Sequence, residues 1–156
     1  MGREELMSQR LEVVNATTPP PVWAALRNEA QAAAKSEAAL ASLIAAVILN
    51  HDSLGDALSY QLARKLGDQE MGAMSLRDTI EEAYEARPAL VEIAEADLKA
   101  VFERDPACKS YVQPFLFFKG FLSLQTHRVG HWQARGRERW QQAGHECSER
   151  GNSRRN

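Results

Sequence analysis

The spacing of apolar side chains predicts helices along most of the chain. Apolar residues recur every three or four positions, and no alternating run rich in Val, Ile and Thr and no Asn-Gly or Asp-Gly hairpin signal occurs. The clearest segment places apolar side chains at i, i+3, i+4, i+7 and i+8, namely Leu40, Leu43, Ile44, Val47 and Ile48. We therefore predict an all-α fold, with this helix central to the core.

Capping residues indicate the bounds of two further helices. Ser53 is a suitable N-cap for a helix that reaches Gly67, and this glycine could take the left-handed position after the last turn. Ser75 and Asp78 resemble a capping box, in which aspartate replaces the usual glutamate. This pair predicts a helix that begins there and ends near Ala86.

Prolines organise the second half of the chain. Pro88 should start a helix that ends before Asp105, because Pro106 disfavours α geometry in the residue before it. Pro114 should open a long last helix with one core-facing stripe, made of Phe115, Phe118, Leu122, Val129 and Trp132. Other apolar residues lie off this stripe and predict burial by neighbouring helices or contact with a second subunit, namely Leu116, Phe117, Phe121 and Leu124.

The two ends of the chain differ from this middle part. Residues 1–21 form a polar leader that ends in a proline-rich linker, so the helical domain is expected over 22–137. The helical periodicity stops after Gly136, and 138–156 is therefore expected to be a frayed or disordered basic tail. Residues 127–156 carry seven arginines and three glutamates, although the whole chain has a formal net charge of -2.

The composition is that of an ordinary globular domain. With 156 residues, 44% of them apolar, the chain can build a hydrophobic core without disulfides or metal ions. Its cysteines, Cys108 and Cys147, form neither a disulfide-rich pattern nor a C-x-x-C motif. No secretory signal is recognisable, and the most apolar stretch, 38–49, is too short to span a membrane. We expect a cytoplasmic protein without a membrane partner.

Isolated chemical groups give weak signals. His127 and His131 lie four residues apart on one helix face and could bind a metal ion, but a zinc site needs further ligands. We favour a polar-edged packing seam of this pair against another helix or subunit, and expect no metal. Cys108 is expected to be an inert, half-buried thiol, since no signature of an activated nucleophile surrounds it.

Nucleotide and nucleic-acid binding are also poorly supported. Neither of the common glycine-rich phosphate-binding loops occurs. A row of arginines could contact phosphates, but such a row is more typical of a solvated helix end, and it consists of Arg128, Arg135, Arg137 and Arg139. We therefore expect no nucleic-acid partner.

Several short blocks stand at characteristic spacings along the chain. They begin with Ala57-Leu58-Ser59-Tyr60 and continue with Arg104-Asp105-Pro106-Ala107, Tyr111, Pro114, Lys119-Gly120-Phe121, Gln125, Arg128, His131-Trp132 and Gly136-Arg137. In order and spacing these blocks resemble the N-terminal helical domain of serine acetyltransferases, the enzymes that acetylate L-serine on the way to cysteine. The resemblance covers roughly residues 22–137.

The resemblance implies a helical domain that precedes a left-handed parallel β-helix. In the family, the β-helix holds the acetyl-CoA site and the catalytic histidine and aspartate. The motifs that lead into it do not follow Gly136 in this sequence, so we expect a truncated or out-of-frame chain. This chain alone is expected to be inactive, with no catalytic, cofactor-binding or metal-binding residue of its own.

Asp105 is the one substrate-binding residue that the resemblance places in this chain. There it would lend a carboxylate to the binding of serine, whose ammonium and hydroxyl are both donors. An equally weighted alternative is that Asp105 only shapes an Asp-Pro turn. The family also assembles through this domain as dimers of trimers, which implies a homo-oligomer. The alternative function is a non-catalytic oligomerisation or protein-interaction module.

Overall fold

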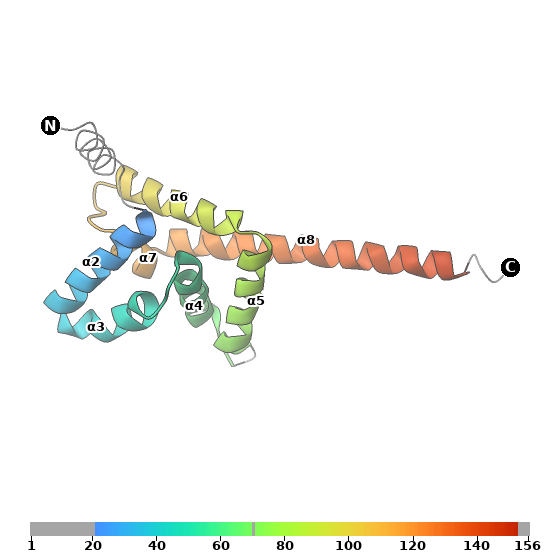
Figure 1. Ribbon diagram of the computed structural model, residues 1–156, viewed down its shortest axis with the longest axis horizontal. Coiled ribbons are helices and arrows are strands. Elements are labelled where there is room, and N and C mark those ends of the chain that lie inside the picture. The colour runs from blue at the N-terminus through green and yellow to red at the C-terminus, as the bar shows by residue number, and fades with distance from the viewer. Residues whose placement is uncertain (1–20, 70, 153–156) are drawn as a thin grey trace, which may run out of the picture.

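The computed structural model describes residues 21–69 and 71–152, and it describes side chains as far as Gly136. Within these ranges every regular element is helical, which confirms the all-α prediction (Figure 1). The elements are α2 (Val22–Ser36), α3 (Ala38–Ile44), the π-helical segment η1 (Ala45–Leu49), α4 (Leu54–Leu66), α5 (Ala73–Ala86), α6 (Ala89–Arg104), α7 (Val112–Phe117) and α8 (Lys119–Asn152). Except for Pro21, the leader 1–21 lies outside the described residues.

The helices α2 and α3 form a hairpin that is completed by η1. The expected helix over 40–48 is confirmed, although its last part is wound as a π-helix. The guanidinium of Arg27 in α2 donates hydrogen bonds to the backbone oxygens of His51 and Leu49, where η1 ends. These bonds satisfy carbonyls that the end of a helix leaves without partners. The hairpin is therefore tied at its open end.

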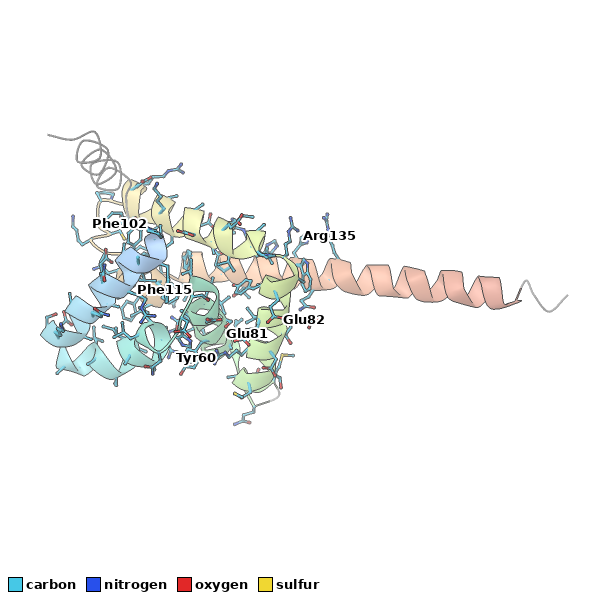
Figure 2. The ribbon with its side chains drawn as sticks, in the orientation of Figure 1. Tyr60, Glu81, Glu82, Phe102, Phe115 and Arg135 are labelled. Carbon is cyan, nitrogen blue, oxygen red and sulfur yellow. The ribbon has the colours of Figure 1, made fainter. Side chains whose placement is uncertain are left out.

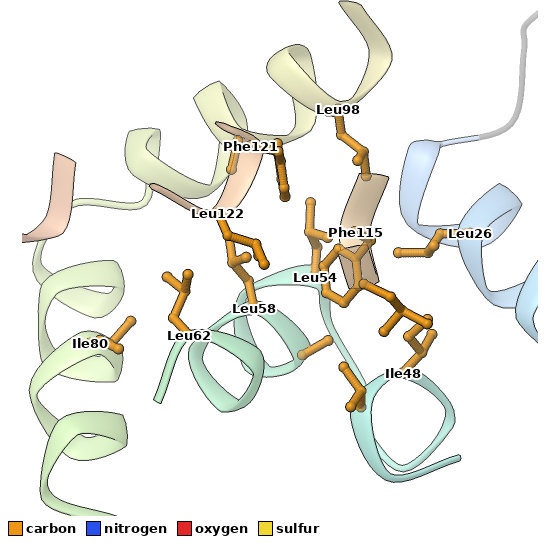
Figure 3. Packing of buried hydrophobic residues seen from close by; sticks show 14 of the residues in the cluster. Leu26, Ile48, Leu54, Leu58, Leu62, Ile80, Leu98, Phe115, Phe121 and Leu122 are labelled. Carbon is orange, nitrogen blue, oxygen red and sulfur yellow. The ribbon is translucent and has the colours of Figure 1, made fainter. Parts of the chain in front are cut away.

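The core lies where α2, η1, α4, α6 and α7 meet. Phe115 of α7 is fully buried at its centre, next to Leu26 of α2 and Leu98 of α6 (Figure 3). Ile44 and Val47 are also fully buried, as the sequence predicted. Complete burial of an aliphatic or aromatic side chain stabilises a fold by roughly 1.5–3 kcal/mol. This core is the main source of stability in the described domain.

The helix α4 begins as predicted but ends differently. The Oγ of Ser53 accepts a hydrogen bond of 3.1 Å from the amide of Asp56, which confirms the N-cap. Gly67 ends the helix, but its φ of −61° and ψ of 136° are extended, so the left-handed cap was a wrong prediction. A Cβ on Gly67 would lie 3.0 Å from the carbonyl oxygen of Ala63 and 3.0 Å from Cα of Ala73. Glycine is therefore needed for the close approach of α5.

The helix α5 starts before the predicted capping box. Its N-cap is Gly72, so Ser75 lies inside the first turn and does not cap the helix. The preceding turn is ordered by Asp68, whose Oδ1 accepts a hydrogen bond of 2.8 Å from the amide of Met71. The turn therefore sets the helix start, and the capping box was a wrong prediction. The predicted end at Ala86 is confirmed.

The last predicted helix is divided in two. Pro88 precedes α6 and Asp105 ends it with extended geometry, both as expected. The single helix from Pro114 was a wrong prediction, because α7 already begins at Val112 and Phe118 adopts an extended ψ of 105° between α7 and α8. Gln61 of α4 explains how this break is stabilised. Its Nε2 donates to the carbonyl oxygens of Phe115 and Leu116, at 3.4 and 3.1 Å, in place of amides from a continuing helix.

The break also decides which off-stripe residues are buried. Leu116 and Phe121 are buried within the domain, whereas Phe117 and Leu124 are 51% and 42% exposed. Beyond these residues α8 continues as a helical backbone that projects past the other helices (Figure 1). A frayed or disordered tail was predicted for 138–156; the backbone of 138–152 is described as part of α8, whereas the side chains of 138–152 and all of 153–156 lie outside the described residues. No helix in the described part is long and apolar enough to cross a membrane.

Candidate functional site around Asp105

Asp105 stands at the sharp turn between α6 and α7. Its Oδ1 accepts a hydrogen bond of 2.9 Å from the amide of Ala107, and its carbonyl oxygen accepts one of 3.0 Å from the amide of Cys108. These bonds are those of a side chain that shapes its own turn. An ionised carboxylate has about four acceptor positions. The turn therefore leaves this carboxylate with capacity to bind a ligand.

Asp105 also lines an open groove, the Asp105 groove. The groove has a volume of about 800 Å³ and lies between the C-terminal half of α6 and the first turns of α8. Its wall includes Asp97, Arg104, Asp105, Phe118, Lys119 and Leu124. Apolar and charged side chains of both signs thus surround one space. The turn-forming interpretation and the ligand-binding interpretation of Asp105 are compatible in this geometry.

A polar cluster joins α6 to α8 beside this groove. The carboxylate of Asp97 accepts hydrogen bonds from both terminal nitrogens of Arg128, and it accepts one of 2.9 Å from Nε2 of Gln125. Arg128 also donates a bond of 3.1 Å to Oε1 of Gln125. Gln125 is only 2% exposed. The cluster fixes how α8 crosses α6 and so fixes the width of the groove.

The cluster changes the acidity of Asp97. Burial by itself would raise the pKa of this carboxyl, but hydrogen bonds from Arg128 and Gln125, together with the charge of Arg128, hold the pKa below its ordinary value. Asp97 therefore stays ionised under mildly acidic conditions. Asp97 was not among the site residues predicted from the sequence. A charged residue between the core positions Ala94 and Leu98 was the available signal.

The histidine pair lies apart from this cluster. The rings of His127 and His131 are stacked on α8, with centroids 6.1 Å apart and an angle of 7° between their planes. Both are exposed, so no other described helix packs over them. A seam against a second subunit stays a prediction. No group of three or more possible metal ligands occurs among the described residues.

The remaining candidates have structural surroundings. Cys108 is buried rather than half-buried, and its Sγ lies 3.3 Å from the carbonyl oxygen of Ser110, to which it donates. Arg128 belongs to the cluster with Asp97, whereas Arg135 is exposed where α8 leaves the other helices (Figure 2). The side chains of Arg137 and Arg139 lie outside the described residues. The four arginines therefore do not form one demonstrated ridge.

The helices that build the Asp105 groove match a known family. Residues 22–126 match the family described as "Serine acetyltransferase, N-terminal". This chain belongs to the serine acetyltransferase family. The matched range includes Asp97, Asp105 and Gln125.

Curated serine acetyltransferases are similar to this chain over one part of their length. The serine acetyltransferase of Salmonella typhimurium is 47% identical over 111 residues, which cover 71% of this chain and 41% of the relative. The chloroplastic serine acetyltransferase 1 of Arabidopsis thaliana is 41% identical over 110 residues, which cover 70% of this chain and 35% of the relative. The chain thus spans about two fifths of the bacterial relative.

Solved serine acetyltransferases share the fold. The Neisseria gonorrhoeae enzyme in complex with serine superposes with a TM-score of 0.73 at 41% identity, covering 78% of this chain and 51% of that one. The Brucella abortus enzyme in complex with coenzyme A gives a TM-score of 0.72 at 36% identity, covering 78% of this chain and 49% of that one. The helical domain of the family is therefore the domain described above.

Proposed function

We propose that this chain serves as the helical domain of a serine O-acetyltransferase. The reaction is acetyl transfer from acetyl-CoA to L-serine, which gives O-acetyl-L-serine for cysteine biosynthesis in the cytoplasm. The observation that carries the proposal is the family match over 22–126, which includes the Asp105 groove. Relatives in complexes with serine and with coenzyme A support the choice of both substrates.

In this function Asp105 binds serine and does not perform the chemistry. Its carboxylate accepts a hydrogen bond from the ammonium or the hydroxyl of serine, while the bond from Ala107 keeps the side chain in one orientation. The cluster of Asp97 and Arg128 keeps α6 and α8 at a fixed distance around the groove. The helical domain thus supplies a preorganised acceptor to a site that a second domain completes.

Acetyl transfer also needs a general base for the serine hydroxyl and donors for the developing oxyanion. The family resemblance implies that these groups and the acetyl-CoA site belong to the β-helix domain. We assign no catalytic, coenzyme-binding or metal-binding role to the described residues. The 156-residue chain by itself should therefore show no serine-dependent release of coenzyme A.

A hybrid enzyme tests this function. Residues 22–136 of this chain would replace the matching helical domain of the Neisseria gonorrhoeae relative, and thiol release from acetyl-CoA would be followed with and without L-serine. We expect serine-dependent turnover by the hybrid and background signal from the 156-residue chain. A folded hybrid without turnover, or turnover by the chain alone that survives repurification, would contradict the proposal.

A second candidate function is a non-catalytic oligomerisation or protein-interaction module. The observation that favours it is the exposure of Phe117 and Leu124, two large apolar side chains on either side of the start of α8. The family resemblance adds the expectation of a homo-oligomer. Sedimentation of the 156-residue chain over a concentration series tests self-association. A monomer at every concentration would exclude the homo-oligomer, and an associating chain would support this role.

A further inference from the structure

A second groove, the Phe117 groove, lies between α4 and the junction of α7 with α8. It has a volume of about 620 Å³, and its apolar wall includes Leu66, Phe117 and Leu122. Its polar wall includes Lys65, Lys119 and His127, and no aspartate or glutamate lines it. The groove therefore combines an apolar surface with two positively charged lysines.

The groove is held in shape by the break between α7 and α8. Gln61 is fully buried, and its side-chain amide binds the carbonyl oxygens of Phe115 and Leu116, directly before Phe117 at the end of α7. Phe117 is 51% exposed and Leu66 is 43% exposed. Few other large apolar side chains in the described part of the chain are exposed. A rigid frame thus presents two apolar side chains to solvent.

The shape and charge of the groove favour one type of occupant. Helices α4 and α8 form its two sides, and an open groove between two helices accepts the apolar face of a third helix. The amines of Lys65 and Lys119 would then lie beside the polar edges of the bound helix, where carboxylates are favoured. We propose that the Phe117 groove binds an acidic amphipathic helix of another protein.

A second copy of this chain fits the groove less well. A twofold contact brings the same surface of two subunits together, so the positive charge of Lys65 and Lys119 would lie against an equally positive surface of the partner copy. Like charges at such a contact oppose association. A partner rich in glutamate and leucine meets no such repulsion. The charge of the groove therefore favours a different protein over self-association at this surface.

A peptide probe tests this inference on the 156-residue chain. The probe is a fluorescently labelled amphipathic peptide of about 18 residues, with leucines on one face and glutamates beside them. Its matched control carries lysine at each glutamate position. We expect the acidic peptide to bind with an affinity that decreases with salt, and the basic peptide to bind at least about tenfold more weakly.

Variants of the chain test whether the peptide binds in the Phe117 groove. The double variant Lys65→Glu/Lys119→Glu should weaken binding of the acidic peptide by about tenfold and strengthen binding of the basic one. The variant Lys35→Glu/Arg87→Glu makes the same change in net charge at exposed positions outside the groove and should change neither affinity. Phe117→Ser should weaken binding of the acidic peptide, because it removes apolar contact surface.

Three results would overturn the inference. The first is equal affinity for the acidic and basic peptides, and the second is equal weakening by the two double variants. The third is self-association that Phe117→Ser abolishes in sedimentation, because a second copy of the chain would then occupy the groove. Circular dichroism of each variant shows whether its helices are retained. The inference does not depend on serine acetyltransferase activity, so it can fail while the proposed function holds.

Discussion

The apolar centre around Phe115 and the junction of α6 with α8 are held together in different ways. At the centre, side chains from α2, η1, α4 and α7 are almost completely buried. At the junction, Asp97, Gln125 and Arg128 form a polar cluster, and Asp105 and Leu124 remain accessible in a groove. A well-packed apolar centre supplies stability. The junction contributes less stability but leaves a carboxylate and an open surface available for binding.

The largest difference between the two regions should appear on removal of a branched aliphatic side chain. Ile44→Ala in the centre should lower the free energy of unfolding by about 2–5 kcal/mol, because it leaves a cavity. Leu124→Ala at the groove should change it by about 0.5 kcal/mol or less. Urea denaturation of both variants measures the difference. Equal midpoints would contradict the position of Ile44 in the stabilising core.

A smaller effect is expected from the buried side-chain amide of Gln61 in α4, which binds the end of α7 at the break. Gln61→Leu should cost about 1–3 kcal/mol, because it removes the donor that satisfies the carbonyls of Phe115 and Leu116. The exposed Gln31→Leu is the matched control and should have little effect. Thermal or urea unfolding gives both values. A stability of Gln61→Leu equal to that of the control would contradict the role assigned to this amide.

The smallest effect should come from the junction, and it should depend on pH. The pKa of Asp97 is held low in the folded state, so its contribution is present above the unfolded carboxyl pKa of about 3.9 and is lost as the pH falls through the folded value. Arg128→Ala should cost about 1 kcal/mol at neutral pH, since the pair is partly exposed.

Unfolding measured from neutral to acidic pH tests the link to Asp97. The difference in stability between the parent chain and Arg128→Ala should shrink as Asp97 becomes protonated. Arg135→Ala changes an exposed arginine on the same helix and should show no such pH-dependent difference. A constant difference between the parent chain and Arg128→Ala at every pH would exclude the ion pair as its cause.

Two local sequence signals predicted helix bounds correctly. Ser53 and Pro106 act within one turn of the backbone they affect, and the helix bounds beside them were predicted correctly. The break at Phe118 was missed because Gln61, which stabilises it, lies 54 residues earlier than Phe115. The periodicity of apolar residues along one helix cannot predict a hydrogen bond from a residue so far away in the sequence.

The candidate site also depends on both local and distant residues. Asp105 was placed by its resemblance to a family motif, and its turn geometry follows from the adjacent proline. The ion pair between Asp97 and Arg128 joins residues 31 positions apart, and no spacing rule connects them. The groove itself arises only when α6 and α8 pack together. The sequence thus predicted the carboxylate of the site, but it did not predict the groove or the distant ion pair beside it.

The serine dependence of the hybrid enzyme tests the central claim most directly. Asp105→Asn would be compared with Asp78→Asn, which makes the same change on the exposed side of α5. Loss of a hydrogen bond to a charged group should raise the KM for L-serine by about tenfold or more in Asp105→Asn, and leave the KM for acetyl-CoA nearly unchanged. Equal KM values for L-serine in the two variants would contradict the assignment of Asp105 to serine binding.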